Sequence, residues 1–222
     1  DRENRPQKLA VEIVRTAEGR PLEISVALPG REVFLRAWKA MVGRVPLYLL
    51  DANVPQNRAE DRDITRNLYG GDVEMRIQQE IVLGIGGYRM LQALGFSIRK
   101  YHMHEGHSAL LALELMHHYA YPPEHIRANE PSCDLPRVRE QCVFTTHTPV
   151  EAGHDKFSYD LIARTLEGYT DIRILRTLAG QDSLNMTQLG LTLSEYVNGV
   201  AEKHAQTSRR LFPGHPVHAI TN

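Results

Sequence analysis

Cysteine, lysine and long apolar runs are all scarce in this sequence, and each shortage argues against a class of protein. The two cysteines, Cys133 and Cys142, are too few for a disulfide scaffold, and we expect reduced thiols in a cytoplasmic protein. No run approaches the roughly 20 apolar residues of a membrane-spanning helix. A net charge of −1 offers no basic surface for nucleic acid and no attraction to an anionic membrane.

Lysine occurs at five positions, so a buried, desolvated lysine of the kind a Schiff-base enzyme requires has few candidates; the five are Lys8, Lys39, Lys100, Lys156 and Lys203. The rest of the composition is ordinary for a globular domain, with 42% hydrophobic and 24% charged residues. The sequence begins without methionine inside a strand-like pattern and closes on an apolar one. We therefore expect a fragment of a longer protein.

The first part of the chain, residues 1–44, is predicted to be an antiparallel β meander attached to the edge of a larger sheet. Apolar and polar residues alternate over residues 9–15, 22–28 and 32–42, and turn residues separate these stretches. In the third stretch Val33, Leu35 and Ala37 would share one face, with Phe34 and Trp38 on the other.

Residues 45–222 show a different pattern, in which strands alternate with helices. Residues 45–51 are almost continuously apolar, as expected for a strand covered on both faces. A long helix should follow, because apolar residues recur at helical spacing. Further strands are predicted at residues 96–103, 143–147 and 217–221, and helices at 105–119 and 184–203. This order predicts an α/β fold with a parallel, doubly wound sheet, in which ligands bind beyond the carboxyl ends of the strands.

A glycine-rich segment, LGIGGYR at residues 83–89, superficially resembles a dinucleotide-binding fingerprint. Arg89 stands where the third glycine would be, and the segment lies inside a predicted helix instead of at a strand-to-helix turn. Glycines inside a helix cost about 1 kcal/mol each relative to alanine. Close packing against a neighbouring element explains them better than nucleotide binding.

The densest polar cluster is HMHEGH at residues 102–107, followed by a second cluster, TTHTPVEAGHD, at residues 145–155. Several imidazoles could ligate zinc, and a metal-dependent hydrolase would use His102, His104, His107 and His147. A polar helix start that binds a neutral ligand is the favoured interpretation, with Glu105 in the first helical turn. The second cluster resembles a ligand-contacting loop at a strand end, and its alternative is a simple helix cap.

Six segments, in the same order, resemble the α-glucan phosphorylase family, which includes glycogen and maltodextrin phosphorylases. They are VGRVPLYLLD (42–51), ITRNLYGGD (64–72), EMRIQQE (74–80), HMHEGHSAL (102–110), FTTHTPVEAGHD (144–155) and ITN (220–222). The resemblance covers nearly the whole chain and implies an internal piece of the family's N-terminal half. The implied fold is the Rossmann-like part of a two-domain glycosyltransferase of the GT-B type, with the C-terminal cofactor domain absent.

The resemblance implies an enzyme that transfers the terminal α-1,4-linked glucosyl unit of a glucan to inorganic phosphate, giving α-D-glucose 1-phosphate. It also implies pyridoxal 5′-phosphate as cofactor, held by a lysine that is not in this chain, and a homodimer for the full-length protein. We expect no cofactor-binding residue and no metal ligand here, and no phosphorylase activity from the chain alone.

Carried over by position, His147 would be catalytic, with its backbone carbonyl facing the positive charge that develops at the anomeric carbon. Asp72 would lie on a gate loop beside the sugar, although by itself it resembles the N-cap of the next helix. Glu105, His107 and Thr148 would bind substrate. His104 departs from the family pattern, which has asparagine there. The alternative functions are a non-catalytic maltooligosaccharide-binding domain and the zinc hydrolase.

Overall fold

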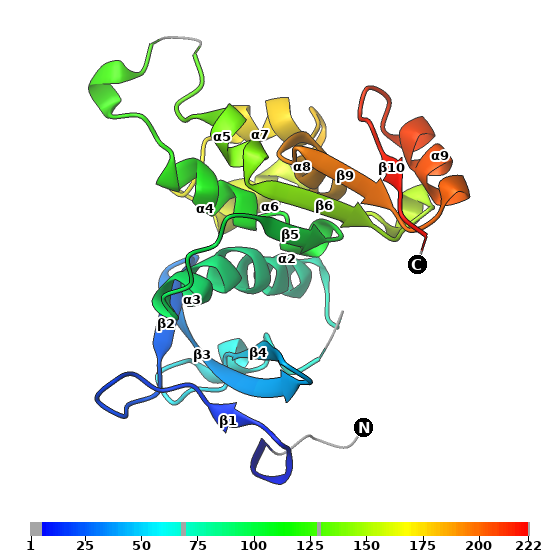
Figure 1. The fold of residues 1–222 in the computed structure, drawn as a ribbon. Coiled ribbons are helices and arrows are strands. Elements are labelled where there is room, and N and C mark those ends of the chain that lie inside the picture. The colour runs from blue at the N-terminus through cyan, green and yellow to red at the C-terminus, as the bar shows by residue number, and fades with distance from the viewer. Residues whose placement is uncertain (1–5, 68–69, 128–129, 222) are drawn as a thin grey trace.

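The computed structural model describes residues 6–67, 70–127 and 130–221, which form three separate sheets (Figure 1). The strands are β1 (Glu12–Ile13), β2 (Glu23–Leu28), β3 (Arg31–Val42), β4 (Val45–Asp51), β5 (Tyr101–His104), β6 (Cys142–Thr146), β7 (Lys156–Ser158), β8 (Ser183–Asn185), β9 (Tyr196–Gly199) and β10 (His218–Ala219). The α-helices are α1 (Ala59–Arg62), α2 (Val73–Ile81), α3 (Gly87–Ala93), α4 (Leu111–His118), α5 (Leu135–Glu140), α6 (Tyr159–Thr165), α7 (Ile172–Ala179), α8 (Met186–Thr192) and α9 (Glu202–Leu211). Shorter helical segments are η1 (Pro6–Lys8), η2 (Val82–Gly86), η3 (Gly106–Ser108), η4 (Pro123–His125) and η5 (Glu151–Gly153).

The first sheet is antiparallel, as the alternating pattern predicts, and its long strand β3 pairs with β1, β2 and β4. Val33, Leu35 and Ala37 are fully buried on one face, and Phe34 and Trp38 are half-buried on the other. This confirms the predicted division of faces. Among the described residues the sheet shares no strand pairing with the parallel sheet, and its expected attachment to the edge of a larger sheet stays a prediction.

Residues 45–51 form a strand, but not one covered on both faces. β4 folds back as a hairpin on β3, with Val42 opposite Val45. Val45, Leu47 and Leu49 are 66%, 46% and 45% exposed. A short apolar run looks the same in sequence whether the strand is central or at an edge, so only the pairing could decide. The meander therefore continues through β4, while the division of the chain into domains stays a prediction.

The predicted long helix is present as α2, η2 and α3 in succession, and it lies between the antiparallel and the parallel sheet (Figure 1). η2 is a π-helical stretch that contains the glycine-rich segment. A Cβ on Gly84 would lie 2.8 Å from the backbone nitrogen of Leu111, at the start of α4, and one on Gly86 would lie 2.7 Å from Leu35 of β3. The two glycines let the helix approach both neighbours, which confirms the close-packing interpretation.

The parallel sheet has the strand order β10-β9-β6-β5, and every neighbouring pair is parallel. This confirms the predicted α/β class with a parallel sheet. The interior strand β9 was missed, because residues 184–203 were predicted to be mostly helical. Only α8 and the beginning of α9 are helical there. The four-residue strand Tyr196–Gly199 is too short to show a periodicity of its own against the flanking helices.

Two other elements are shorter than predicted. The strand expected over residues 96–103 is confined to β5, and the helix expected over residues 105–119 begins at Gly106 as η3 and becomes α-helical at Leu111. Glu105 therefore stands between strand and helix. The strand expected at residues 217–221 is β10, and Asn222 lies outside the described residues. In the part of the chain that the structure describes, no helix is long and apolar enough to cross a bilayer.

Candidate functional site

Four of the five predicted site residues, all except Asp72, lie where β5 and β6 end, at the carboxyl edge of the parallel sheet. β5 leads through Glu105 into η3, which carries His107, and β6 leads into the loop with His147 and Thr148. Because β5 and β6 are neighbouring parallel strands, with His104 opposite Thr145, both chain segments leave the sheet side by side. This edge is where open α/β sheets bind ligands.

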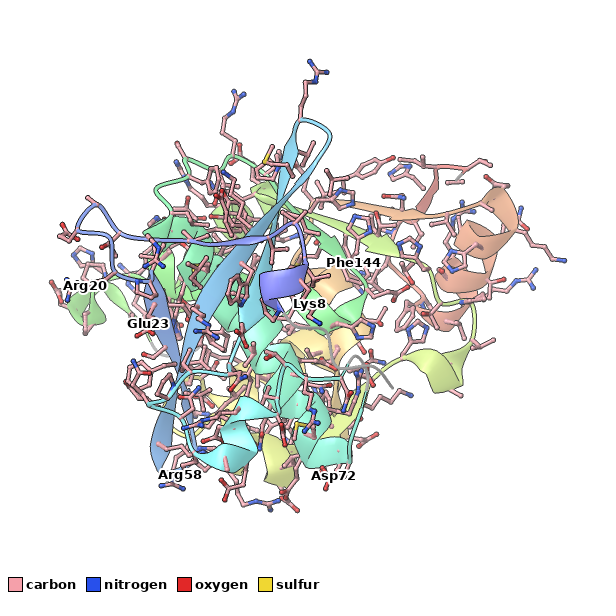
Figure 2. All side chains as sticks on the ribbon, turned by 90° about the horizontal axis from the view of Figure 1, so that it is seen from below. Lys8, Arg20, Glu23, Arg58, Asp72 and Phe144 are labelled. Carbon is pink, nitrogen blue, oxygen red and sulfur yellow. The ribbon has the colours of Figure 1, made fainter. Side chains whose placement is uncertain are left out.

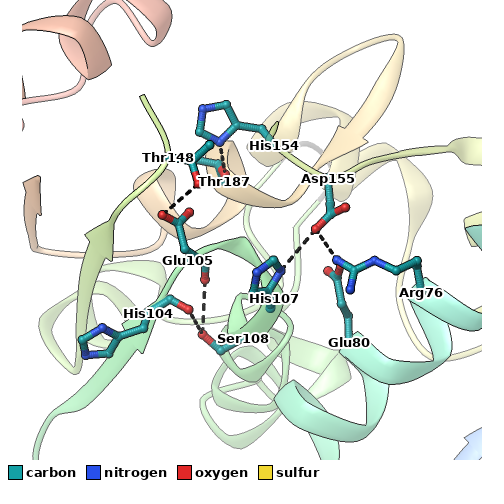
Figure 3. Close-up of polar contacts among 10 residues, drawn as sticks. All are labelled: Arg76, Glu80, His104, Glu105, His107, Ser108, Thr148, His154, Asp155 and Thr187. Atoms are coloured by element: carbon teal, nitrogen blue, oxygen red, sulfur yellow. Dashed lines mark hydrogen bonds and ion pairs between the residues drawn. The ribbon is translucent and has the colours of Figure 1, made fainter. Parts of the chain in front are cut away.

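Glu105 accepts hydrogen bonds from the loop that follows β6 (Figure 3). Its Oε1 lies 3.2 Å from the Thr148 hydroxyl and 3.4 Å from the Thr146 hydroxyl, and it also accepts from the backbone N–H of His147. Glu105 is thus not in the first turn of a helix, as expected, and its charge is satisfied by the neighbouring loop. The structure brings together three predicted residues, Glu105, His147 and Thr148.

His147 is exposed and its ring is paired with His104. The His104 Nδ1 and His147 Nε2 atoms are 3.2 Å apart, and the two rings stack with centroids 5.5 Å apart. Burial, followed by the neighbouring rings of His102 and His147, lowers the pKa of His104. Which of the two rings donates this hydrogen bond depends on their tautomers, so His104 has a defined local partner in His147.

His102 lies beside His104, with ring centroids 4.4 Å apart, but its hydrogen bond goes to the neighbouring strand. Its Nε2 lies 2.7 Å from the hydroxyl of Thr145, which donates to Asn198 of β9 at 2.9 Å. Asn198 is buried and lies on the strand that sequence reasoning missed. The hydrogen bonds between His102 and Thr145 and between Thr145 and Asn198 therefore join the ends of β5, β6 and β9.

His107 points away from this histidine group and toward Asp155 (Figure 3). Its Nδ1 lies 3.2 Å from Asp155 Oδ2, and the same oxygen lies 2.6 Å from the guanidinium of Arg76 on α2. Arg76 is also 3.5 Å from Glu80, one turn further along α2. Glu80 is 2% exposed, so a buried carboxyl group stands at the centre of this second cluster.

Glu80 and Asp155 have opposite pKa shifts. Burial, together with the negative charge of Asp155, raises the pKa of Glu80 to about 9, despite the nearby Arg76. Burial opposes ionisation of Asp155 as well, but the hydrogen bond from His107 and the charge of Arg76 outweigh it, and its pKa is lowered. At neutral pH the cluster therefore contains a protonated Glu80 beside an ionised Asp155.

The zinc site expected as an alternative, built on four histidines, is not formed among the described residues. Within residues 6–67, 70–127 and 130–221, the cluster with three potential ligand atoms less than 4.8 Å apart consists of Glu80, His107 and Asp155. The Arg76 guanidinium already supplies a positive charge to both carboxyl groups there.

Asp72 lies at the beginning of α2, at the molecular surface (Figure 2). Its Oδ1 accepts a hydrogen bond from the backbone nitrogen of Met75 at 2.9 Å, which confirms the N-cap role. Part of the predicted gate loop, Leu68 and Tyr69, lies outside the described residues. No hydrogen bond or ion pair joins Asp72 to the Glu105 group in the described ranges, so its place beside a sugar stays a prediction.

Glu80 and Asp155 were not predicted as members of the site, and His154 was considered only as a possible additional zinc ligand. His154 is buried, its Nδ1 lies 2.8 Å from the Thr187 hydroxyl, and burial lowers its pKa. Glu80 could have been found from the sequence, because it lies three residues after Ile77 and therefore on the apolar stripe of its helix. His154 and Asp155 belonged to the recognised motif, but their partners Thr187 and Arg76 are distant in sequence.

Comparison with known proteins agrees with the motif order along the chain. The chain is 39% identical over 214 residues to the maltodextrin phosphorylase of Thermococcus litoralis, which covers 95% of this chain and 25% of that protein. It is 38% identical over 229 residues to the glycogen phosphorylase of Mycobacterium tuberculosis, with 93% and 26% covered. The chain is related to the maltodextrin and glycogen phosphorylases. The resemblance stated from the six motifs is thereby confirmed.

The match to these phosphorylases is extensive for the chain but partial for its relatives. The glycogen phosphorylase of Aquifex aeolicus is 27% identical over 239 residues, which cover all of this chain and 34% of that protein. The chain spans 25% and 26% of the length of the Thermococcus and Mycobacterium relatives. No protein-family model matches the chain.

The lysines of the chain do not fit a pyridoxal phosphate Schiff base. All five are within the described residues and none is buried: Lys8, Lys100, Lys156 and Lys203 are exposed, and Lys39 is half-buried beside Glu12. A Schiff-base lysine is activated by desolvation or by a neighbouring cation, and Lys100 and Lys156 instead contact glutamates. The lysines present therefore do not suit the cofactor.

Proposed function

We propose that this chain forms the glucosyl-contacting wall of an α-glucan phosphorylase of the GT-B type. The complete protein would transfer the terminal α-1,4-linked glucosyl unit of glycogen, starch or maltodextrin to inorganic phosphate, releasing α-D-glucose 1-phosphate. A second domain outside this chain would supply the pyridoxal phosphate. Support comes from the phosphorylase names of relatives that match nearly the whole chain.

The observation that carries the proposal is the arrangement of His147, Thr148 and Glu105 at one end of the parallel sheet. A neutral sugar is recognised by polar groups that donate and accept hydrogen bonds, and this edge offers imidazoles, hydroxyls and backbone groups. His147 is exposed, as a substrate contact must be before the substrate arrives. Its backbone carbonyl would face the anomeric carbon and stabilise positive charge there.

The cluster of Arg76, Glu80, His107 and Asp155 would line a deeper part of the same site. His107 lies between the Glu105 segment and Asp155, and its ring retains some solvent exposure. In the proposed function His107 would hydrogen-bond a sugar hydroxyl or a water, and Asp72 would approach from the gate loop. The full-length protein would act as a homodimer.

Phosphorolysis by the complete protein that carries this chain tests the proposal. With maltoheptaose and inorganic phosphate we expect glucose 1-phosphate. His147→Ala keeps the backbone carbonyl but removes the imidazole that would contact the glucosyl unit, and it should lower kcat by a factor on the order of 10². Glu124→Gln, an exposed acid on η4, is the matched surface control and should leave the rate unchanged. Absence of glucose 1-phosphate from the wild-type protein would overturn the proposed reaction.

The 222-residue chain alone is predicted to be inactive, because none of its lysines suits the cofactor. Turnover by the purified chain would contradict this. Tight binding of maltoheptaose by the chain, combined with an inactive complete protein, would instead favour a sugar-binding domain without catalysis.

A further inference from the structure

Glu105 has a backbone conformation that L-residues rarely adopt. Its φ is 58° and its ψ is 172°, and among the described residues it is the non-glycine position with positive φ. This region of φ/ψ space is occupied almost only by glycine, and strain of this kind persists where the surroundings enforce it. The next residue, Gly106, is packed closely against α8, because a Cβ added to it would lie 2.8 Å from Met186.

Backbone contacts hold Glu105 in place on both sides. Its N–H donates to the carbonyl oxygen of Thr145 at 2.9 Å, which continues the pairing of β5 with β6. Its own carbonyl oxygen accepts from the Ser108 hydroxyl at 3.3 Å. The chain must therefore turn at Glu105 between a fixed strand and a fixed helical turn, and its side chain is directed across the end of β6.

A single oxygen of the Glu105 carboxylate accepts hydrogen bonds from three consecutive residues. Oε1 accepts from the hydroxyls of Thr146 and Thr148 and from the N–H of His147. Thr146 is buried and is the last residue of β6, so the carboxylate joins a rigid strand end to the exposed residue that follows. Bonds to an ionised acceptor are about twice as strong as neutral ones.

We infer that Glu105 is a positioning residue that fixes the peptide groups around His147, and that its strained backbone exists to aim the carboxylate at residues 146–148. This deepens the proposed function and rests on it only for the identity of the reaction. The resemblance alone suggested that Glu105 binds the sugar directly. The geometry instead commits its Oε1 to the protein, so the effect of Glu105 on a substrate would pass through His147.

Amide hydrogen exchange in the complete protein tests the structural half of this inference. Glu105→Gly removes the carboxylate and also relieves the backbone, whereas Glu105→Gln keeps the shape and one acceptor oxygen. We expect exchange at the His147 amide to rise at least about tenfold in Glu105→Gly and less in Glu105→Gln. Glu151→Gln, which removes an exposed acid from the same loop, should leave that amide unchanged. Unchanged protection in Glu105→Gly would overturn the inference.

Kinetics separate positioning from direct sugar binding. If Glu105 positions His147, kcat should fall about tenfold or more in Glu105→Gln while KM for maltoheptaose changes little, because orientation matters most in the transition state. A rise in KM with unchanged kcat would indicate a direct sugar contact and would overturn the inference. If the wild-type protein shows no phosphorolysis, the proposed function fails, and the exchange experiment still decides whether Glu105 holds the His147 loop.

Discussion

Arg76 on α2 contacts Asp155, 79 residues further along the chain, with 2.6 Å between Nη2 and Oδ2. α2 begins immediately after Asp72 and the predicted gate loop, and Asp155 ends the loop that contains His147. The ion pair thus connects two segments that the proposed function places on the same sugar. Glu80 lies beside this pair with a carboxyl group that is almost completely buried.

Glu80 should make the stability of the protein decrease with rising pH. Its folded pKa of about 9 exceeds the ordinary value of 4.5, so the folded chain keeps a proton that the unfolded chain releases. Between these values the free energy of unfolding should fall by about 1 kcal/mol per pH unit from this group. Urea denaturation from about pH 5 to about pH 8.5 should show a flatter dependence for Glu80→Gln than for the wild type. Glu74→Gln, at an exposed position on the same helix, should keep the wild-type slope.

Gly84 and Gly87 offer a matched pair of alanine substitutions in one continuous helix. A Cβ on Gly84 would lie 2.8 Å from the backbone nitrogen of Leu111, which cannot move aside as a side chain would. Gly84→Ala should therefore destabilise the protein by about 1–3 kcal/mol or more. A Cβ on Gly87 would meet no neighbouring atom within 4 Å, so Gly87→Ala should stabilise by about 0.5–1 kcal/mol. Equal melting temperatures for the two variants would contradict this packing.

Removal of the Glu114 side chain should destabilise the protein, because its carboxylate accepts hydrogen bonds from two partly buried partners. Its Oε1 lies 2.7 Å from Arg89 and 2.8 Å from the Tyr169 hydroxyl. Glu114→Ala would deprive a guanidinium and a hydroxyl of this acceptor, at a cost of about 2–4 kcal/mol. Glu124→Ala, at an exposed position, should change the free energy of unfolding by less than about 0.5 kcal/mol. A similar midpoint of urea denaturation for both variants would rule out a structural role for this network.

The two cysteines should be unreactive in the folded protein. Both are buried, and burial raises the pKa of Cys142 to about 12 and the pKa of Cys133 above its ordinary value. Thiolate is the reactive form, so a thiol reagent at about pH 8 should label the native chain slowly and the urea-unfolded chain rapidly. Rapid labelling of both thiols under native conditions would contradict the buried positions.

The strained Glu105 should make a glycine variant more stable than its lost contacts suggest. Relief of the backbone should return about 1–3 kcal/mol, which offsets much of the loss of the three hydrogen bonds. We expect the thermal midpoint of Glu105→Gly to equal or exceed that of Glu105→Ala, which loses the same carboxylate but keeps the strain. A lower midpoint for the glycine variant would show that the conformation is not strained.

Features whose signal lies within a few residues could be predicted before the fold was known. Alternation indicated the faces of β3, helical spacing indicated the helix from α2 to α3, and the aspartate before it indicated the Asp72 cap. The order of motifs indicated the relationship to the phosphorylases and therefore the candidate residues His147 and Glu105. Such signals survive in a single sequence because backbone geometry repeats every two or about 3.6 residues.

The pairing of strands and the partners of buried polar side chains followed only from the three-dimensional arrangement. β4 is an exposed hairpin strand and β9 takes an interior place in the parallel sheet, because pairing depends on segments that are distant in sequence. In the same way Glu105 receives its hydrogen bonds from residues more than 40 positions away. Buried polar groups must find partners wherever the fold brings them, and residue order alone does not say in advance which partners those will be.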